Sequence, residues 1–192
     1  MHAMNETTAA TYLILPGLRD HVAEHWQTLL QAELPGAQAV PPLEQDKLSR
    51  AARVDALQRA VDAIDGPIIV VAHSAGCITL VHWALQYPQH TQRIKAALLA
   101  TPSDMERPLP AGYPSLEALE QGGWLPVPRS RLPFRSLLAV SRNDALASFE
   151  RVREYAQDWG SELVDIGNVG HLNPAAGYGP WPLAHELLAR LG

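Results

Sequence analysis

The sequence contains only one cysteine, Cys77, and its longest apolar runs, at 68–72 and 96–100, are short. A single cysteine excludes an intramolecular disulfide framework and a zinc site built from cysteine ligands. The apolar runs fall far below the ~20 residues that a membrane-spanning helix needs. Residues 1–11 hold no lysine or arginine, and the apolar run that follows them is too short for a secretory signal. We therefore expect a cytoplasmic protein that does not bind a membrane.

An excess of basic residues is also missing. The chain has 15 Lys and Arg against 20 Asp and Glu, a net charge of −5. Nucleic-acid-binding domains present a basic face, so we expect no nucleic-acid partner, and we interpret Arg129, Arg131 and Arg135 as part of a solvated loop. With 192 residues, 47% of them hydrophobic, the chain can bury one core. We expect a single domain over residues 1–192, with residues 1–10 as a flexible tail.

The apolar residues alternate between the spacing of strands and the spacing of helices. Such βα repeats predict an α/β protein with a mainly parallel sheet of about six strands and helices on both faces, and ligands bind such sheets at the carboxyl ends of the strands. We expect strands at 12–15, 38–40, 68–72, 94–100, 136–140 and 163–166, and helices at 22–30, 54–64 (capped by Ser49), 77–85, 116–119, 149–159 and 183–191.

Residues 102–133 interrupt this alternation with seven prolines. Loops of this length inside a compact domain are usually functional or disordered. The presence of Tyr113, Leu116, Leu119 and Trp124 favours a packed segment near the site. We refer to residues 102–133 as the excursion.

Ser74 lies where a buried strand is expected to turn into a helix, within Ala72-His73-Ser74-Ala75-Gly76. This pentapeptide resembles the GxSxG nucleophile elbow, in which a tight strand-to-helix turn requires small residues two positions before and after the serine. Ala72 replaces the usual first glycine. The simpler alternative is that Ser74 only caps the helix.

A nucleophilic serine needs a histidine to take its proton and a carboxylate to orient that histidine. His171 follows the last expected strand in the glycine-flanked loop Gly170-His171-Leu172, and Asp144 follows the strand before it. Both residues are expected at carboxyl strand ends, in the order serine, acid, histidine. Asp104, after the preceding strand, is a rival for the acid. We favour Ser74, Asp144 and His171 as the catalytic residues.

An acyl-transfer intermediate carries an oxyanion that two backbone N–H groups commonly bind. Ala75, directly after the serine, supplies one candidate, and Leu18 in the turn after the first strand supplies the other. For the substrate pocket we consider Trp124, His73 and Asn173, although His73 is expected to play a structural part. We expect no cofactor and no bound metal, because this chemistry needs neither.

Five stretches together resemble the small serine hydrolases related to retinoblastoma-binding protein 9, which include bacterial YdeN-like proteins: Leu15-Pro16-Gly17 with His25-Trp26, the elbow, Ser141-Arg142-Asn143-Asp144, Gly170-His171-Leu172-Asn173 and Gly177-Tyr178-Gly179-Pro180-Trp181-Pro182. The resemblance implies an α/β-hydrolase fold without a large lid domain and a triad at Ser74, Asp144 and His171. It also implies esterase-like or aminopeptidase-like activity, while the substrate itself does not carry over.

Taken together, the residues predict a serine hydrolase that cleaves a small ester, thioester or amide, including short peptides, through an acyl-enzyme intermediate. Two other classes stay open. The chain could be a protein-interaction module on a hydrolase scaffold, because fold does not determine function. It could also be an acyltransferase or lyase that uses the same residues.

Overall fold

The computed structural model describes residues 8–192, so most of the expected tail at residues 1–10 lies outside the described part of the chain. Six strands form one sheet in which every neighbouring pair is parallel, in the order β2-β1-β3-β4-β5-β6. The strands are β1 (Thr11–Leu15), β2 (Gln38–Ala39), β3 (Ile68–His73), β4 (Ile94–Ala100), β5 (Arg135–Val140) and β6 (Glu162–Asp165). The predicted parallel sheet is confirmed.

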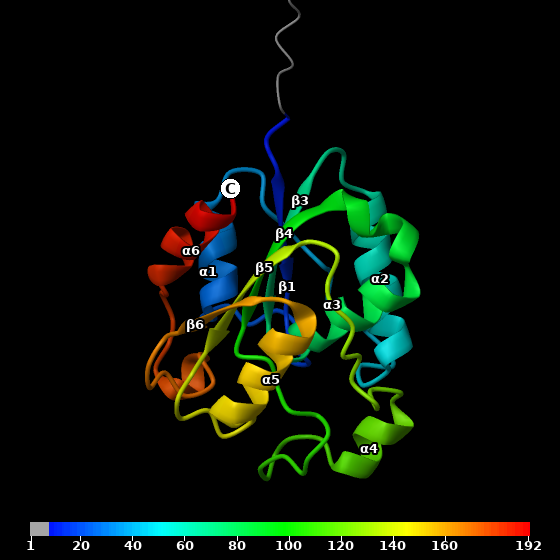
Figure 1. Ribbon diagram of the computed structural model, residues 1–192, viewed down its shortest axis with the longest axis vertical. Coiled ribbons are helices and arrows are strands. Elements are labelled where there is room, and N and C mark those ends of the chain that lie inside the picture. Colours follow the sequence, from blue (N-terminus) through cyan, green and yellow to red (C-terminus); the bar gives the residue numbers. More distant parts are fainter. Residues whose placement is uncertain (1–7) are drawn as a thin grey trace, which may run out of the picture.

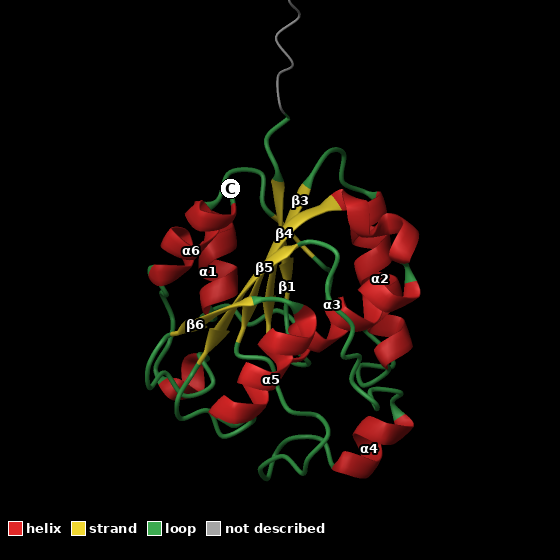
Figure 2. Cartoon of the chain, in the orientation of Figure 1, coloured by secondary structure: helices red, strands yellow, loops and turns green. Residues whose placement is uncertain are grey.

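Helices cover both faces of the sheet (Figures 1 and 2), with α1 and α6 on one face and α2, α3 and α5 on the other. Among residues 8–192, no helix has both the length and the apolar character required to cross a bilayer. The helices are α1 (Trp26–Glu33), α2 (Arg50–Asp62), α3 (Ala75–Gln86), α4 (Leu116–Gln121), α5 (Phe149–Trp159) and α6 (Leu183–Leu191), with 3₁₀ turns η1 (Pro88–Arg93) and η2 (Pro174–Ala176).

Strand β3 lies inside the sheet and is buried along its whole length. Successive side chains of a strand point to opposite faces. Ile68 and Val70 accordingly belong to the core under α2, α3 and α5, and Ile69 and Val71 to the core under α1 and α6. Burial on both faces explains why the strand is a continuous apolar run rather than an alternating one.

The first helix begins later than its apolar spacing predicts. It starts at Trp26, with His25 as the N-cap, whose side chain accepts a hydrogen bond from the Gln27 N–H. Val22 lies in the preceding turn, where its carbonyl accepts the N–H of His25 at 3.1 Å and the hydroxyl of Thr28 at 2.7 Å. The predicted start at residue 22 is therefore wrong, because these local hydrogen bonds close a turn before the helix.

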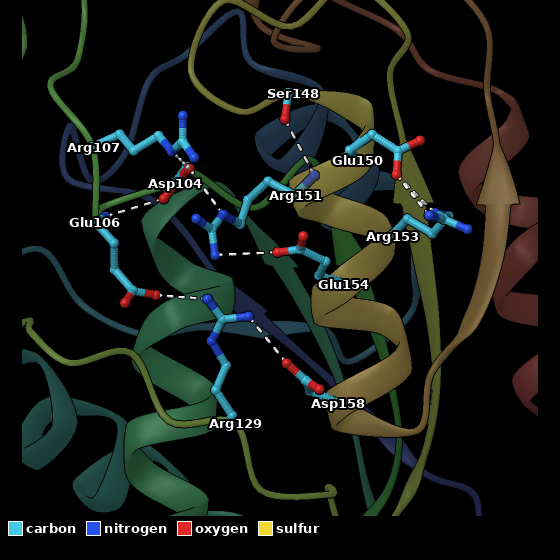
Figure 3. Close-up of polar contacts among 10 residues, drawn as sticks. All are labelled: Asp104, Glu106, Arg107, Arg129, Ser148, Glu150, Arg151, Arg153, Glu154 and Asp158. Atoms are coloured by element: carbon cyan, nitrogen blue, oxygen red, sulfur yellow. Dashed lines mark hydrogen bonds and ion pairs between the residues drawn. The ribbon is translucent and has the colours of Figure 1, made fainter.

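The excursion packs against α5 through a network of ion pairs (Figure 3). Arg129 bridges Glu106, at 2.8 Å, and Asp158 of α5, at 3.0 Å. Arg151 of α5 contacts Asp104 at 3.1 Å. The expectation of a solvated loop is thus wrong for Arg129, which joins the two segments. Several such pairs in one network hold the segment more firmly than an isolated surface pair would.

The fold holds three buried histidines neutral. Burial, and next the electrostatic effect of the neighbouring His171, lowers the pKa of His25 to about 4. The same two causes lower the pKa of His73 well below its ordinary value of 6.5. Burial lowers the pKa of His82 to about 4, even though its ring N–H donates to the Trp124 carbonyl at 3.0 Å.

We expect the free energy of unfolding to fall as the pH drops from 6.5 toward 4. Above pH 6.5 these histidines are neutral in both states, whereas below it only the unfolded chain binds their protons, which favours unfolding. His82→Gln keeps a side-chain N–H for the Trp124 carbonyl and removes one titrating group. This variant should lose about 2 kcal/mol less stability than the parent between pH 7 and pH 5, measured by urea unfolding.

The matched control for this comparison is His21→Gln, because His21 is exposed. The control should lose as much stability on acidification as the parent does. Equal losses in the parent, the control and His82→Gln would contradict a neutral, buried His82.

Candidate active site

Ser74 occupies the turn between β3 and α3 with φ 57° and ψ −125°, a backbone conformation that residues other than glycine rarely adopt. Its N–H donates to the Ala100 carbonyl at 3.0 Å, so the neighbouring strand holds the strained turn in place. A Cβ on Gly76 would lie 2.4 Å from the Leu15 carbonyl oxygen, and one on Gly17 would lie 3.3 Å from Ser74 Cβ. Close approach of the β1 turn therefore requires the small residues around this serine.

Three side chains from different strand ends form one hydrogen-bonded chain. His171 Nε2 lies 2.8 Å from Ser74 Oγ, and His171 Nδ1 lies 2.8 Å and 3.0 Å from the carboxylate oxygens of Asp144. The side chains of His171 and Asp144 are 8% and 2% exposed. Because the carboxylate only accepts, His171 Nδ1 carries the proton and Nε2 accepts from the Ser74 hydroxyl.

The loop that carries His171 is anchored through its backbone. The His171 carbonyl accepts the His73 Nε2–H at 2.9 Å and the Thr101 hydroxyl at 3.4 Å. The side-chain oxygen of Asn143 accepts the Gly170 N–H at 2.7 Å. These contacts at Gly170 and His171 hold the imidazole between Ser74 and Asp144.

Ser103 is a site residue that the sequence patterns do not single out. Its hydroxyl lies 2.8 Å from Ser74 Oγ, and the residue is 3% exposed. Since the Ser74 proton points to His171, Ser103 donates to Ser74. The only signal available in the sequence is its place just after β4, at the same sheet edge as Ser74.

Leu18, in the turn after β1, and Ala75 both line the cavity that contains Ser74. Within residues 8–192, neither of their backbone N–H groups has a hydrogen-bond acceptor. Arg53 of α2 fixes the turn by donating to the Leu18 carbonyl at 3.1 Å and to Asp20 at 2.7 Å. Two fixed N–H groups beside a serine are suited to binding an oxyanion.

A cavity of about 260 Å³ opens beside Ser74. Its apolar wall comes from the excursion, from the turns after β1 and β5, and from η2. Among the described residues of the lining, Asp20 is the one acidic side chain and is ion-paired with Arg53, and Arg19 is the one arginine or lysine. The apolar residues of the wall are Leu18, Val22, Met105, Leu109, Tyr113, Pro114, Leu146, Pro174 and Ala175.

Two of the three predicted pocket residues line this cavity, namely His73 and Asn173. Trp124 does not line it, so that prediction is wrong. Trp124 is fully buried beside His82 of α3, and its ring N–H donates to the Leu48 carbonyl at 2.8 Å. A large aromatic ring gains most from complete burial once its N–H has an acceptor.

Asp104, the rival acid, has no contact with His171 in the described part of the chain. Its carboxylate accepts from Arg151 at 3.1 Å and from the Glu106 N–H at 3.1 Å. Both oxygens are therefore engaged within the excursion and α5. Across residues 8–192, no group of three His, Cys, Asp or Glu side chains is arranged to hold a metal ion.

Known proteins match this chain over nearly its whole length. A family model described as serine hydrolase matches residues 12–190. A structure described as a YdeN-like hydrolase from Pectobacterium atrosepticum is 30% identical with a TM-score of 0.78, over 95% of this chain and 90% of the other. A search of curated protein sequences finds no match.

Two more distant structures share the fold. The ydeN gene product from B. subtilis is 18% identical with a TM-score of 0.71, over 95% of this chain and 98% of the other. The mouse alpha/beta hydrolase domain-containing protein 10 is 13% identical with a TM-score of 0.69, over 97% of this chain and 92% of the other. These likenesses support the predicted α/β-hydrolase fold without a large lid domain.

Proposed function

Because the chain belongs to the serine hydrolase family, among its small YdeN-like members, we propose that it cleaves a small ester, thioester or amide through an acyl-enzyme intermediate. The observation that carries this proposal is the continuous hydrogen-bonded chain from Ser74 through His171 to Asp144. Such a chain is what a serine hydroxyl needs to act as a nucleophile near neutral pH.

In the proposed reaction, Ser74 Oγ attacks the substrate carbonyl while His171 Nε2 takes the hydroxyl proton. The Leu18 and Ala75 N–H groups bind the oxyanion, and Asp144 stabilises the imidazolium that forms. His171 then gives the proton to the leaving alcohol, thiol or amine, and the acyl group stays on Ser74. Water, deprotonated by His171, attacks the acyl-enzyme and releases the acid, returning the proton to Ser74.

Ser103 has a supporting part in this reaction. By donating to Ser74 Oγ, it leaves one orientation for the Ser74 proton, toward His171 Nε2. The nucleophile is thus oriented before substrate arrives, which lowers the entropic cost of reaching the transition state.

The described lining of the cavity offers no unpaired carboxylate to a substrate that carries a free amine. An aminopeptidase needs a carboxylate to bind the substrate ammonium group, yet Asp20 is already paired with Arg53, and its side chain is 6% exposed. Burying an ammonium group without a partner is costly. We therefore place esters and amides without a free amine ahead of peptides with a free N-terminus.

The direct test is intact-mass spectrometry after treatment with a fluorophosphonate, which labels activated serines without requiring a known substrate. We expect one adduct on the wild-type protein and none on Ser74→Ala. Ser148→Ala is the matched control, because Ser148 is also an N-cap serine, and it should be labelled like the wild type. An adduct that persists in Ser74→Ala, or a folded wild type without any adduct, would overturn the proposal.

A further inference from the structure

The lining of the Ser74 cavity contains three buried polar residues beside its apolar wall: His25, Gln27 and His73. They are neighbours, because the His25 side chain accepts the Gln27 N–H and the ring centroids of His25 and His73 lie 4.6 Å apart. The three residues are 9%, 3% and 5% exposed. His25 and Gln27 come from the start of α1, and His73 is the last residue of β3, directly before Ser74. The proposed reaction assigns no chemical step to any of the three.

Gln27 is fixed by the sheet and keeps one unused acceptor. Its side-chain amide nitrogen donates to the Leu15 carbonyl at 3.1 Å and to the Val71 carbonyl at 3.0 Å. These two bonds use both amide hydrogens and fix the orientation of the group. Within residues 8–192, Gln27 Oε1 has no donor.

The two histidines have defined tautomers. His25 Nδ1 accepts the Gln27 N–H at 3.1 Å, so the neutral ring carries its proton on Nε2, where no acceptor lies in the described part of the chain. His73 is the reverse case: its Nε2–H donates to the His171 carbonyl, which leaves the Nδ1 lone pair free of a donor among the same residues. The lowered pKa values of both rings keep them neutral at pH 7.

One donor and two acceptors are therefore left unpaired, although buried polar atoms are normally paired. None of the three is sealed in the protein: in the described residues, only Trp26 Nε1 and Tyr155 Oη are both unpaired and closed off from solvent. His25 and Gln27 also border a second hollow of about 350 Å³, whereas His73 borders the Ser74 cavity and not that hollow. Because His73 lines only the Ser74 cavity, we assign the three unpaired atoms to that cavity and not to the second hollow.

We propose that His25, Gln27 and His73 form a subsite for a neutral hydrogen-bonding group of the substrate, a hydroxyl or a primary carboxamide, placed next to the scissile bond. This inference rests on the proposed function and adds a substrate class to it. A hydroxyl donates once and accepts, which matches one N–H and neighbouring acceptors. A carboxylate would find one N–H donor and no cation among these three side chains, and its charge would face two acceptors, so the subsite disfavours it.

The test compares kcat/KM for matched esters that differ in one group. Methyl butanoate is the apolar parent, methyl 3-hydroxybutanoate and methyl succinamate carry the neutral polar group in the acyl part, and monomethyl succinate carries a carboxylate. Ethyl butanoate and 2-hydroxyethyl butanoate make the same comparison on the alcohol side. In at least one pair we expect the neutral polar ester to be favoured roughly fivefold over its parent, the effect of one neutral hydrogen bond. Monomethyl succinate should be the poorest substrate.

His25→Asn retains a side-chain acceptor for the helix N-cap and removes the ring N–H. In this variant the advantage of the polar ester should fall to about one. His21→Asn, an exposed position that borders the second hollow, is the control and should keep the wild-type ratio. The subsite would be overturned if, in the wild type, kcat/KM for every neutral polar ester equalled that for its apolar parent. It would also be overturned if this kcat/KM ratio changed in His21→Asn instead of in His25→Asn.

The two proposals fail in different ways. If the wild type hydrolyses parent and polar esters equally well, the subsite is excluded while the proposed function stands. If folded wild type hydrolyses no ester and takes no fluorophosphonate adduct, both are excluded together. If it takes the adduct but hydrolyses none of these esters, the two compounds to compare are 3-hydroxybutanamide and butanamide, as protectants of Ser74 against labelling. The subsite then predicts stronger protection by 3-hydroxybutanamide, and equal protection would exclude it.

Discussion

Replacing Ser74 by alanine is expected to lower kcat/KM for ester hydrolysis about 10⁶-fold, to the level left by the oxyanion donors and substrate binding. The reason is that the alanine has no atom to form the acyl-enzyme, and His171 alone cannot replace it. The strained backbone at Ser74 is held by the Ala100 carbonyl and by the close β1 turn, and the substitution touches neither. The variant should therefore fold. Steady-state kinetics and urea unfolding measure the two effects separately.

Ser148→Ala serves as the control for this experiment, because it removes another N-cap serine that does not line the cavity. Its kcat/KM should stay at the wild-type value, with a small loss of stability from the missing cap. Retention of substantial hydrolysis by Ser74→Ala would contradict a nucleophilic Ser74 and would support the interpretation of Ser74 as a helix cap.

Asp144→Asn should have the second largest effect, lowering kcat about 10⁴-fold. The substituted amide can donate to His171 Nδ1, which favours the tautomer with its proton on Nε2. That proton would face Ser74 Oγ, so the histidine could no longer accept the hydroxyl proton. Shape and volume change little, and the substrate KM should change far less than kcat.

The matched control is Asp104→Asn, which changes the rival acid in the same way. Asp104 pairs with Arg151 instead of His171, so this variant should lose stability through a weakened buried ion pair while keeping kcat near the wild-type value. Equal losses of kcat in the two variants would contradict the assignment of Asp144. A loss confined to Asp104→Asn would identify Asp104 as the acid.

Local sequence was sufficient for the elements whose ends are marked by nearby residues. Helix α5 has the expected bounds, because Ser148 caps its start and Gly160, with φ 69°, ends it in the left-handed region. Strand β3 is recognisable as a short β-rich apolar run, and the small residues around Ser74 follow from the turn that joins it to α3. The expected strands also predict that Ser74, Asp144 and His171 lie at carboxyl strand ends.

Predictions that depended on distant partners were less successful. Trp124 belongs to the excursion, which the sequence places near the site. Its position is set by Leu48, whose carbonyl accepts the Trp124 ring N–H from 76 positions away. Ser103 stands 29 positions from Ser74, and no local pattern marks it. The single-domain organisation, the cytoplasmic location and the catalytic roles stay predictions.

The sequence by itself thus determined the α/β class, the elbow and the three residues that the proposed reaction needs, because periodicity, caps and tight turns act over a few residues. Only the tertiary structure decided which acid faces His171, which hydroxyl holds Ser74, how Arg53 fixes the Leu18 turn and which polar atoms near Ser74 remain unpaired. Those features are set by packing between segments far apart in the chain, where burial and hydrogen-bond geometry select one partner among several of the same chemical type.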